Sequence, residues 1–278
     1  MKNINTAITI DLEDWFHGII SVNNSLDLQK GLENRFIEST LSCLKTLSKS
    51  KVKATFFILG CLAEQAPNLI KEIHKEGHEI ASHGWNHQLV YNLSHDDFYE
   101  SIYKTKNILE DIINESVYGY RAPYFSITKK SLWALPILEK VGYIYDASIH
   151  PFKNFMYGIQ GAPTSCYYPT PRLLEIPPTC IEVLGLRIPW AGGLYFRILP
   201  YKVFKFGFDK YCNNNRTIYF HTADFDIYQP YLKCSLLEKF IHYYGLKSLP
   251  KKMEKFIHDY NPSTIDNVYH NFLCKLKK

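Results

Sequence analysis

Short apolar runs that end in a polar or charged residue recur along the first two-thirds of this chain. Residues 53–60 are rich in aromatic and β-branched side chains, and an amphipathic stretch, 62–76, follows and ends at Gly77. The first pattern predicts a buried strand and the second a surface helix. The alternation continues with predicted strands at 79–82, 117–120, 143–145 and 217–220 and predicted helices at 95–114, 129–141 and 200–212. This order predicts a parallel sheet with helices outside it, closed or nearly closed into a barrel.

The regular alternation is interrupted between residues 150 and 197, where prolines and glycines accumulate. Such a stretch predicts a loop-rich insertion that walls one side of the barrel mouth. Helices are predicted at 232–244, 249–260 and 264–274. Since the chain contains no internal repeat, low-complexity tract or linker, we expect one α/β domain over residues 1–278, with a core at about 5–230 and C-terminal helices at 231–278.

Composition is that of a globular protein, with 46% hydrophobic and 21% charged residues in 278. The net charge is +5, and many lysines lie after residue 246. They indicate either a solvated surface or attraction to an anionic lipid head group or a diphosphate-linked substrate. The seven cysteines form no C-x-x-C pair, which argues against a disulfide framework and a cysteine zinc site.

The N-terminal residues 1–5 contain no apolar signal core, and no apolar run approaches the roughly 20 residues needed to span a bilayer. We therefore expect a cytoplasmic protein without a transmembrane segment, at most peripheral to the inner face of a membrane. Nothing in the sequence indicates a nucleic-acid partner.

Polar residues stand where the predicted strands end. They are the acidic cluster Asp11-Leu12-Glu13-Asp14, then His83, Arg121, Asp146 and His221. Because the carboxyl ends of parallel strands meet at one mouth, these side chains are expected to share a site.

His83 and His87 are four residues apart, so their imidazoles can converge on one metal ion. A third ligand from the acidic cluster would complete a two-histidine, one-carboxylate site with room for water, and zinc is the expected ion. The sequence leaves open whether Asp11, Glu13 or Asp14 supplies that carboxylate.

Metal-bound water has a lowered pKa, and a second carboxylate can complete its deprotonation. His221 is the natural proton donor to a departing amine because an imidazole titrates near neutral pH. Arg121 keeps its proton, so it is better suited to holding a carboxylate, and Asp146 could pair with it. A buried structural ion pair would look the same in sequence.

The ordered set of motifs resembles the polysaccharide deacetylase family, also called the NodB-homology or carbohydrate esterase family 4 group, over residues 5–230. The motifs are Thr9–Asp14, Thr55–Phe57, His83–His87, Arg121–Tyr124 and His221. The family's first motif, T-F-D-D, is matched up to Asp11, but the next carboxylates are spaced out. The D-x-E-D-W form resembles a branch found among bacterial exopolysaccharide and surface-glycan deacetylases.

The resemblance implies a distorted (β/α) barrel and roles for individual residues. Asp11 would be the base, and Asp14, preferred over Glu13, would bind metal with His83 and His87. Arg121 would orient the base.

By the same resemblance, Asp146 would steady this arginine and His221 would be the catalytic acid. The backbone N–H of Tyr124 would help to hold the oxyanion. Trp190 and Gly193 lie in a segment that looks like the substrate side of the same branch.

Three functions remain open from the sequence. The first is a metal-dependent hydrolase that removes acetyl from an N-acetylated sugar of a polysaccharide or of a lipid- or nucleotide-linked glycan precursor. The second is a hydrolase of a small amide or formamide. The third is an inactive glycan-binding barrel, against which the complete set of catalytic groups argues.

Overall fold

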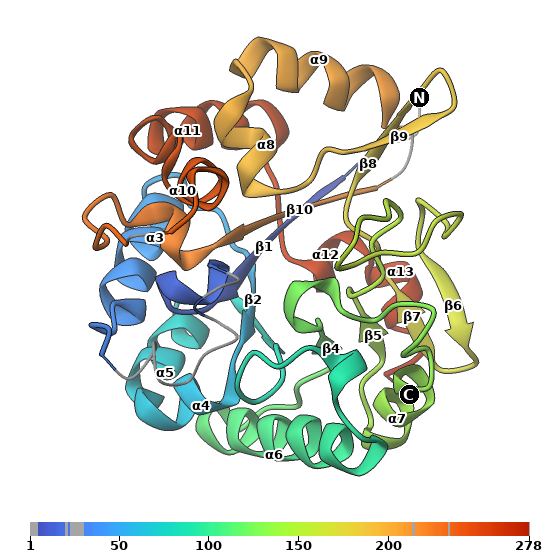
Figure 1. The fold of residues 1–278 in the computed structure, drawn as a ribbon. Helices are drawn as coiled ribbons and strands as arrows, with labels where there is room; N and C mark the ends of the chain where they lie inside the picture. The colour runs from blue at the N-terminus through green and yellow to red at the C-terminus, as the bar shows by residue number, and fades with distance from the viewer. Residues whose placement is uncertain (1–4, 20–21, 23–30, 213–214, 233, 278) are drawn as a thin grey trace.

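A curled, mainly parallel sheet forms the centre of the molecule, and helices cover its outer face (Figure 1). The structure is a computed structural model that describes residues 5–19, 22, 31–212, 215–232 and 234–277. The eight strands follow the order β10-β1-β2-β3-β4-β5-β7-β6. Neighbouring strands are parallel except β6 and β7, which pair antiparallel. The predicted barrel is confirmed as an open, distorted α/β barrel.

The strands of the sheet are short, and all except the edge strand β6 are largely buried. Their bounds are β1 (Thr6–Leu12), β2 (Thr55–Ile58), β3 (Glu79–Ser82), β4 (Gly119–Tyr120), β5 (Tyr145–Asp146), β6 (Tyr167–Thr170), β7 (Leu173–Glu175) and β10 (Arg216–His221). β1 lies between β10 and β2, and all seven of its residues are buried. This fully buried strand leads directly into the acidic cluster.

The larger helices pack outside the sheet (Figure 1). They are α3 (Phe36–Lys49), α4 (Gly60–Gln65), α5 (Pro67–Lys75), α6 (His95–Ile113), α7 (Ala134–Val141), α8 (Gly193–Ile198), α9 (Tyr201–Tyr211), α10 (Leu236–Tyr243) and α11 (Leu249–Tyr260), with the short α12 (Ile265–Val268) and α13 (His270–Leu273).

Local chemistry explains where the elements depart from the sequence prediction. The helix expected over 62–76 is divided at Ala66, because Pro67 cannot donate the backbone hydrogen bond that a continuous helix needs. The helix expected over 129–141 begins only at Ala134. The prediction did not include α3, although its buried stripe contains Phe36, Cys43 and Leu47.

The insertion at 150–197 is more ordered than its proline content indicated. It contributes β6 and β7 to the main sheet and forms a separate antiparallel hairpin, β8 (Cys180–Val183) with β9 (Leu186–Pro189). Its end reaches the other edge of the sheet, where Gly192 bridges to Tyr219 of β10. The insertion therefore walls the mouth on the side where β10 ends. Among the described residues, no helix is long and apolar enough to cross a membrane.

Candidate active site

Polar side chains from several strand ends meet at the carboxyl edge of the sheet, as the sequence predicted. Asp11 is the register partner of His221 on β10 and of Phe57 on β2. Glu13 follows two residues after Asp11, and His83 follows β3 directly. Because parallel strands end at one side, residues 210 positions apart in sequence become neighbours.

Glu13 lies between the two histidines. Its Oε1 atom is 2.9 Å from His83 Nε2 and 3.0 Å from His87 Nε2, and all three residues are at most 3% exposed. Burial alone would raise the pKa of Glu13, but His87 and His83 outweigh it and hold the pKa well below its usual range. The carboxylate therefore stays ionised.

The orientation of His83 leaves a metal-ligating atom directed at Glu13. His83 Nδ1 lies 2.8 Å from the carbonyl oxygen of Arg121, which can only accept, so Nδ1 carries the hydrogen. In the neutral ring, Nε2 then presents its lone pair to a carboxylate oxygen. Two acceptors at this separation need a proton or a cation between them. The donor set suits a divalent ion, since ligand atoms around tetrahedral zinc are roughly 3.3 Å apart.

Asp14, which the sequence favoured as the metal carboxylate, points elsewhere. Its Oδ1 atom accepts from Trp15 N at 2.8 Å, and both of its oxygens accept from Arg35 N, at 3.0–3.1 Å. It thereby caps the short helix at Trp15–Gly18. Burial raises the pKa of Asp14 to about 6, despite these hydrogen bonds. Glu13 rather than Asp14 therefore lies against the two histidines, and the sequence spacing did not show this capping role of Asp14.

Asp11 is held by a fully buried arginine. Arg121 donates to Asp11 Oδ1 at 2.7 Å and to Thr9 Oγ1 at 2.9 Å, and its guanidinium stacks 4.0 Å from the Phe57 ring centre. Arg121 Nε also donates to the carbonyl of Ala147. The permanently charged guanidinium thus holds the Asp11 carboxylate in a fixed orientation.

Asp146 does not pair directly with Arg121, contrary to the sequence expectation. Its Oδ1 accepts from Ser148, and its partner across β5 and β7 is Glu175. Burial, followed by the charge of Asp146, raises the pKa of Glu175 well above its usual range, and burial raises the pKa of Asp146 to about 6. Two buried carboxyl groups side by side do not both ionise readily, so the pair carries about one negative charge, which acts on Arg121.

His221 is the last residue of β10, which lies beside β1 on the side away from β2. Its Nδ1 lies 3.5 Å from Asp224 Oδ2, which also accepts from the His221 backbone N–H at 2.9 Å. Burial lowers the pKa of His221, but Asp224, Glu13 and Asp11 outweigh burial and raise it to about 9. An imidazolium at neutral pH is the protonation state that a general acid requires.

Asp224 is in turn fixed by Arg197 on α8. Arg197 Nε lies 3.1 Å from Asp224 Oδ1, and both side chains are about 5% exposed. The arginine, followed by His221, overcomes the effect of burial and lowers the pKa of Asp224 to about 2. A Cβ atom at Gly193 would lie 2.5 Å from Asp224 Oδ2, so this glycine leaves room for the aspartate.

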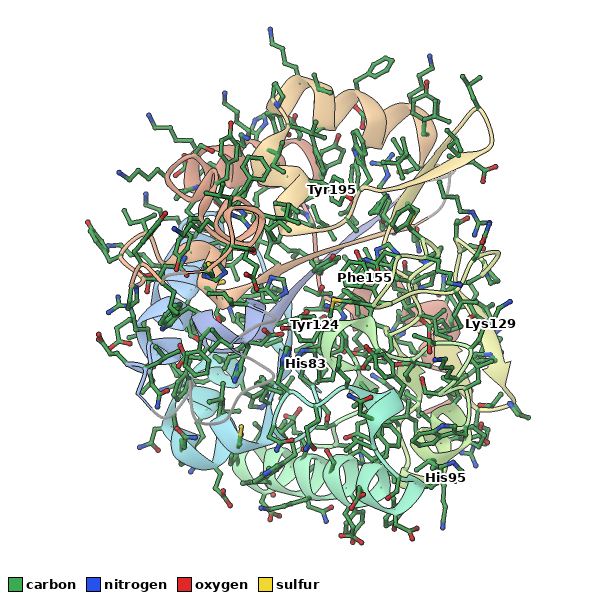
Figure 2. The ribbon with its side chains drawn as sticks, in the orientation of Figure 1. His83, His95, Tyr124, Lys129, Phe155 and Tyr195 are labelled. Carbon is green, nitrogen blue, oxygen red and sulfur yellow. The ribbon has the colours of Figure 1, made fainter. Side chains whose placement is uncertain are left out.

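A pocket of about 370 Å³ opens over these groups, and Asp11, Glu13, His87 and His221 line it. Aromatic side chains form its walls: Tyr124, Phe125, Phe155, Tyr157, Tyr195 and Tyr219. Figure 2 shows His83, Tyr124 and Phe155 grouped near the centre of the view, away from His95 and Lys129 at the periphery.

Two other rings hold His87 in place. His17 stacks on it with ring centres 5.0 Å apart, and Tyr124 lies 4.8 Å away. The Tyr124 hydroxyl donates to the carbonyl of His17, which links both rings. Tyr124 and His87 have φ values of 52° and 58°, an unfavourable region for residues with side chains. The backbone is therefore strained where it brings these rings to the pocket.

Of the residues expected on the substrate side, Tyr124 and Gly193 line the pocket and Trp190 does not. Trp190 stacks on Phe204 with ring centres 6.0 Å apart, and its indole N–H donates to the Phe204 carbonyl. The close approach of Gly207 to this indole completes its enclosure. Trp190 is therefore a buried residue that packs against α9.

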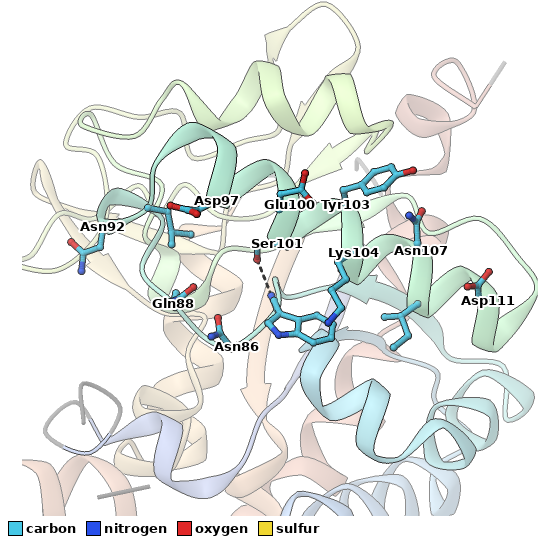
Figure 3. Close-up of a pocket in the computed structure, with 13 residues that line it drawn as sticks. Asn86, Gln88, Asn92, Asp97, Glu100, Ser101, Tyr103, Lys104, Asn107 and Asp111 are labelled. Carbon is cyan, nitrogen blue, oxygen red and sulfur yellow. Dashed lines mark hydrogen bonds between the residues drawn. The ribbon is translucent and has the colours of Figure 1, made fainter. Parts of the chain in front are cut away.

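A second, more open hollow of about 900 Å³ lies beside α6, on the outer side of the loop that carries His87 (Figure 3). Amide and acidic side chains line it, and Lys104 covers the Trp85 ring at 3.4 Å. Ser101 Oγ accepts from Trp85 N at 3.1 Å and supports the histidine loop from behind. None of the strand-end groups reaches this hollow, so the smaller pocket is the candidate active site.

Glu175 and Asp224, which shape the site, were not among the residues predicted from the sequence, and neither His17 nor Arg197 was given a defined role there. Asp224 carried a detectable signal, since it stands three residues after a predicted catalytic histidine. Arg197 and Glu175 lie in the irregular insertion, where no period indicates which side chains point inward.

Comparison with protein families divides the chain into two stretches. A model of the polysaccharide deacetylase family matches residues 36–145, and a domain of unknown function (DUF3473) matches residues 147–270. The first stretch contains His83, His87 and Arg121. Both stretches contribute strands to the main sheet.

Sequence relatives agree with the first match. A peptidoglycan-N-acetylglucosamine deacetylase of Bacillus cereus is 37% identical over 99 residues, which are 35% of this chain and 36% of that protein. A peptidoglycan-N-acetylglucosamine deacetylase PgdA of Listeria monocytogenes is 36% identical over 103 residues, 37% of this chain and 21% of the relative. The aligned region thus spans about a third or less of these relatives.

Solved structures show the same fold. A putative polysaccharide deacetylase from Mycobacterium smegmatis superposes with a TM-score of 0.55 at 18% identity, covering 95% of this chain and 94% of that one. The family predicted from the motifs is confirmed over residues 36–145, which match the model of the polysaccharide deacetylase family.

Proposed function

We propose that this protein is a metal-dependent hydrolase that removes acetyl groups from an N-acetylated sugar of a polysaccharide or surface-glycan precursor. The observation that carries the proposal is the meeting of three units in one pocket. They are the carboxylate–histidine cluster of Glu13, His83 and His87, the Arg121–Asp11 pair, and the His221–Asp224 pair. The relatives named as peptidoglycan deacetylases support the reaction class.

Glu13, His83 and His87 would hold the ion, with zinc as the expected metal. Their donor atoms lie within 4.8 Å of one another, and the arginine carbonyl fixes the His83 ring. Hydrogen bonds of this kind typically orient a metal-ligating histidine. When bound, a divalent ion supplies a water of lowered pKa and polarises the acyl oxygen.

The chain's own residues divide the proton transfers. Asp11 accepts a proton at its carboxylate, and Arg121 holds that carboxylate in position. His221 donates a proton to the departing amine; because its Nδ1 faces Asp224, its Nε2 is the nitrogen left for this task. Asp146 and Glu175 lie outside the pocket. They act as positioning residues, because the negative charge that they share attracts Arg121, which in turn holds Asp11.

The pocket suits a sugar ring carrying a small acyl group. Its volume of about 370 Å³ is at the lower end of small-molecule sites, and its aromatic walls can stack on the apolar face of a sugar. Which sugar, linkage and carrier are used stays open, as does the cytoplasmic location predicted from the sequence.

Acetate release from N-acetylglucosamine oligomers and N-acetylated polysaccharide tests the proposal. Wild-type protein loaded with zinc should release acetate, and His83→Ala and Asp11→Asn should not. His258→Ala is the matched control, since that histidine side chain is 88% exposed and remote from the pocket. Binding of these glycans without acetate release would favour the inactive barrel. Release from small amides alone would favour the small-amide hydrolase.

A further inference from the structure

Helix α10 (Leu236–Tyr243) turns its apolar side to solvent. The exposed side chains at and after this helix are Leu236, Leu237, Phe240, Ile241 and Tyr244, with exposures of 38–85%. Their spacing of i, i+1, i+4, i+5 and i+8 places them on one helix face. A surface helix normally packs this face against the core, so here it is available to another surface.

The apolar face continues onto the preceding loop. Tyr228 is 80% exposed and Tyr231 is 70% exposed, and the Tyr231 ring packs 5.0 Å from Tyr243 of α10. We call the set Tyr228, Tyr231, Leu236, Leu237, Phe240 and Tyr244 the α10 surface. Contiguous apolar surface of this kind on a soluble domain commonly marks an interaction site.

The C-terminal end of α10 is held by hydrogen bonds. Arg197 donates to the carbonyls of Ile241, His242 and Tyr244 at 2.6–3.0 Å. Tyr243 donates its hydroxyl hydrogen to the Pro230 carbonyl at 2.9 Å. These bonds hold the C-terminal end of the helix in place, so its exposed apolar side chains face outward in a defined direction.

The α10 surface adjoins the catalytic pocket. Gln229, Ile241 and His242 line that pocket, and His242 Nε2 lies 2.6 Å from Gln229 Oε1. Phe155, which is 91% exposed, lines the same pocket from the insertion (Figure 2). Whatever covers the α10 surface therefore lies close to the pocket mouth.

We propose that the α10 surface docks onto an anionic lipid surface. Lysines flank it: the Lys239 amino group lies 5.1 Å from the Tyr231 ring centre, and Lys247 and Lys251 are exposed just after α10. Leucine and phenylalanine beside tyrosine and lysine suit the boundary between acyl chains and anionic head groups. Two adjacent leucines suit a sugar poorly, since sugar faces are recognised by flat rings with polar neighbours.

Docking would bring the pocket mouth to the lipid surface. If the protein deacetylates glycans as proposed above, this position favours a glycan attached to a lipid over a free polymer. The docking itself depends only on the α10 surface and its lysines, so it can be tested without an activity measurement.

Flotation of the purified full chain with vesicles tests the docking. The probes are vesicles of phosphatidylcholine alone and of phosphatidylcholine with phosphatidylglycerol. Wild-type protein should float with the anionic vesicles, and binding should weaken with added salt. The triple variant Leu236→Ser, Leu237→Ser, Phe240→Ser should lose on the order of a hundredfold in partitioning, since three large apolar side chains would no longer insert. Lys247→Glu, Lys251→Glu should lose binding to anionic vesicles only.

Leu184→Ser, Leu186→Ser is the matched control, because these leucines are 98% and 70% exposed on the β8–β9 hairpin, away from α10. It should bind vesicles like wild type. Equal binding by the triple variant, or no vesicle binding by wild type, would overturn the proposal. The proposal would also be overturned if wild-type protein formed a dimer, bound no vesicles, and lost the dimer in the triple variant. The triple variant should still release acetate from soluble oligomers. If the proposed function is wrong, wild-type protein will release no acetate either, so the two failures can be distinguished.

Discussion

Replacing Asp224 with Asn should separate the proton-donating role of His221 from its place in the fold. Asp224 is 5% exposed, lies 3.5 Å from His221 Nδ1 and accepts from the His221 backbone N–H. Asn keeps the shape and an acceptor oxygen but removes the charge. The substitution therefore acts on the pKa of His221 without creating a cavity.

The structure sets the size of the effect. The pKa of His221 rises from 6.5 to about 9, and Asp224 shares this increase with Glu13 and Asp11. Loss of the Asp224 charge should therefore lower the pKa of His221 by about 1–2 units. The alkaline limb of kcat/KM for an N-acetylated oligosaccharide should move down by the same amount, which reduces the rate roughly two- to tenfold near pH 8.

Asp226→Asn is the matched control. Asp226 is a buried carboxylate paired with Arg35 at 2.7 Å, two residues beyond Asp224. Each variant leaves an arginine with a weakened partner, so both should be destabilised by up to about 3–5 kcal/mol. Only Asp224→Asn should move the alkaline limb of the pH–rate profile. An unchanged limb in Asp224→Asn, or the same shift in both variants, would refute the assignment.

Three further predictions concern separate residues. His221→Ala should retain metal and lose about 10²–10⁴-fold on an amide but much less on an aryl acetate, whose leaving group needs little protonation; equal losses in the two hydrolysis assays would exclude a general acid. Glu13→Gln should weaken zinc affinity more than about 100-fold, which exceeds the loss expected for a residue that only supports a metal ligand. Asp14→Asn should change the affinity by less than about tenfold. Competition with a chromogenic chelator measures both affinities, and the reverse order would assign Asp14 as the ligand. His78 accepts a hydrogen bond from Ala54 N, and burial lowers its pKa from 6.5 to about 4. As the pH falls, this histidine is therefore protonated in the unfolded chain before it is protonated in the folded protein. The free energy of unfolding should consequently fall as the pH drops from 6.5 towards 4. His78→Asn should remove up to about 3 kcal/mol of this loss in urea unfolding at the two pH values, and an identical pH dependence in both proteins would contradict the explanation.

The alternation of strands and helices along the chain and the residues at the strand ends could be predicted, because both depend on local pattern. An apolar run followed by a polar residue places that residue at the carboxyl edge, as for Asp11, His83 and His221. The choice between Glu13 and Asp14 could not be predicted. It depends on the turn after β1, where Asp14 is drawn to the backbone of Arg35, 21 residues later in the chain.

The contacts that the insertion makes could not be predicted from the sequence pattern either. Trp190 resembled a sugar-stacking residue beside two glycines, but the neighbouring helix α9 offers a cavity against Phe204 and Gly207 that encloses it. Asp146 resembled an arginine partner, yet β7 places Glu175 directly opposite it. Both outcomes depend on packing between segments distant in the sequence, which no local period encodes.

The measurement that tests the account most directly is a crystal structure of the zinc-soaked protein with anomalous diffraction at the zinc edge. One strong anomalous peak should lie about 2.0–2.2 Å from Glu13 Oε1, His83 Nε2 and His87 Nε2, with Asp14 still bonded to the backbone of Arg35. A peak coordinated by Asp14, or no peak between the two histidines at a zinc concentration that supports acetate release, would contradict the proposed metal site.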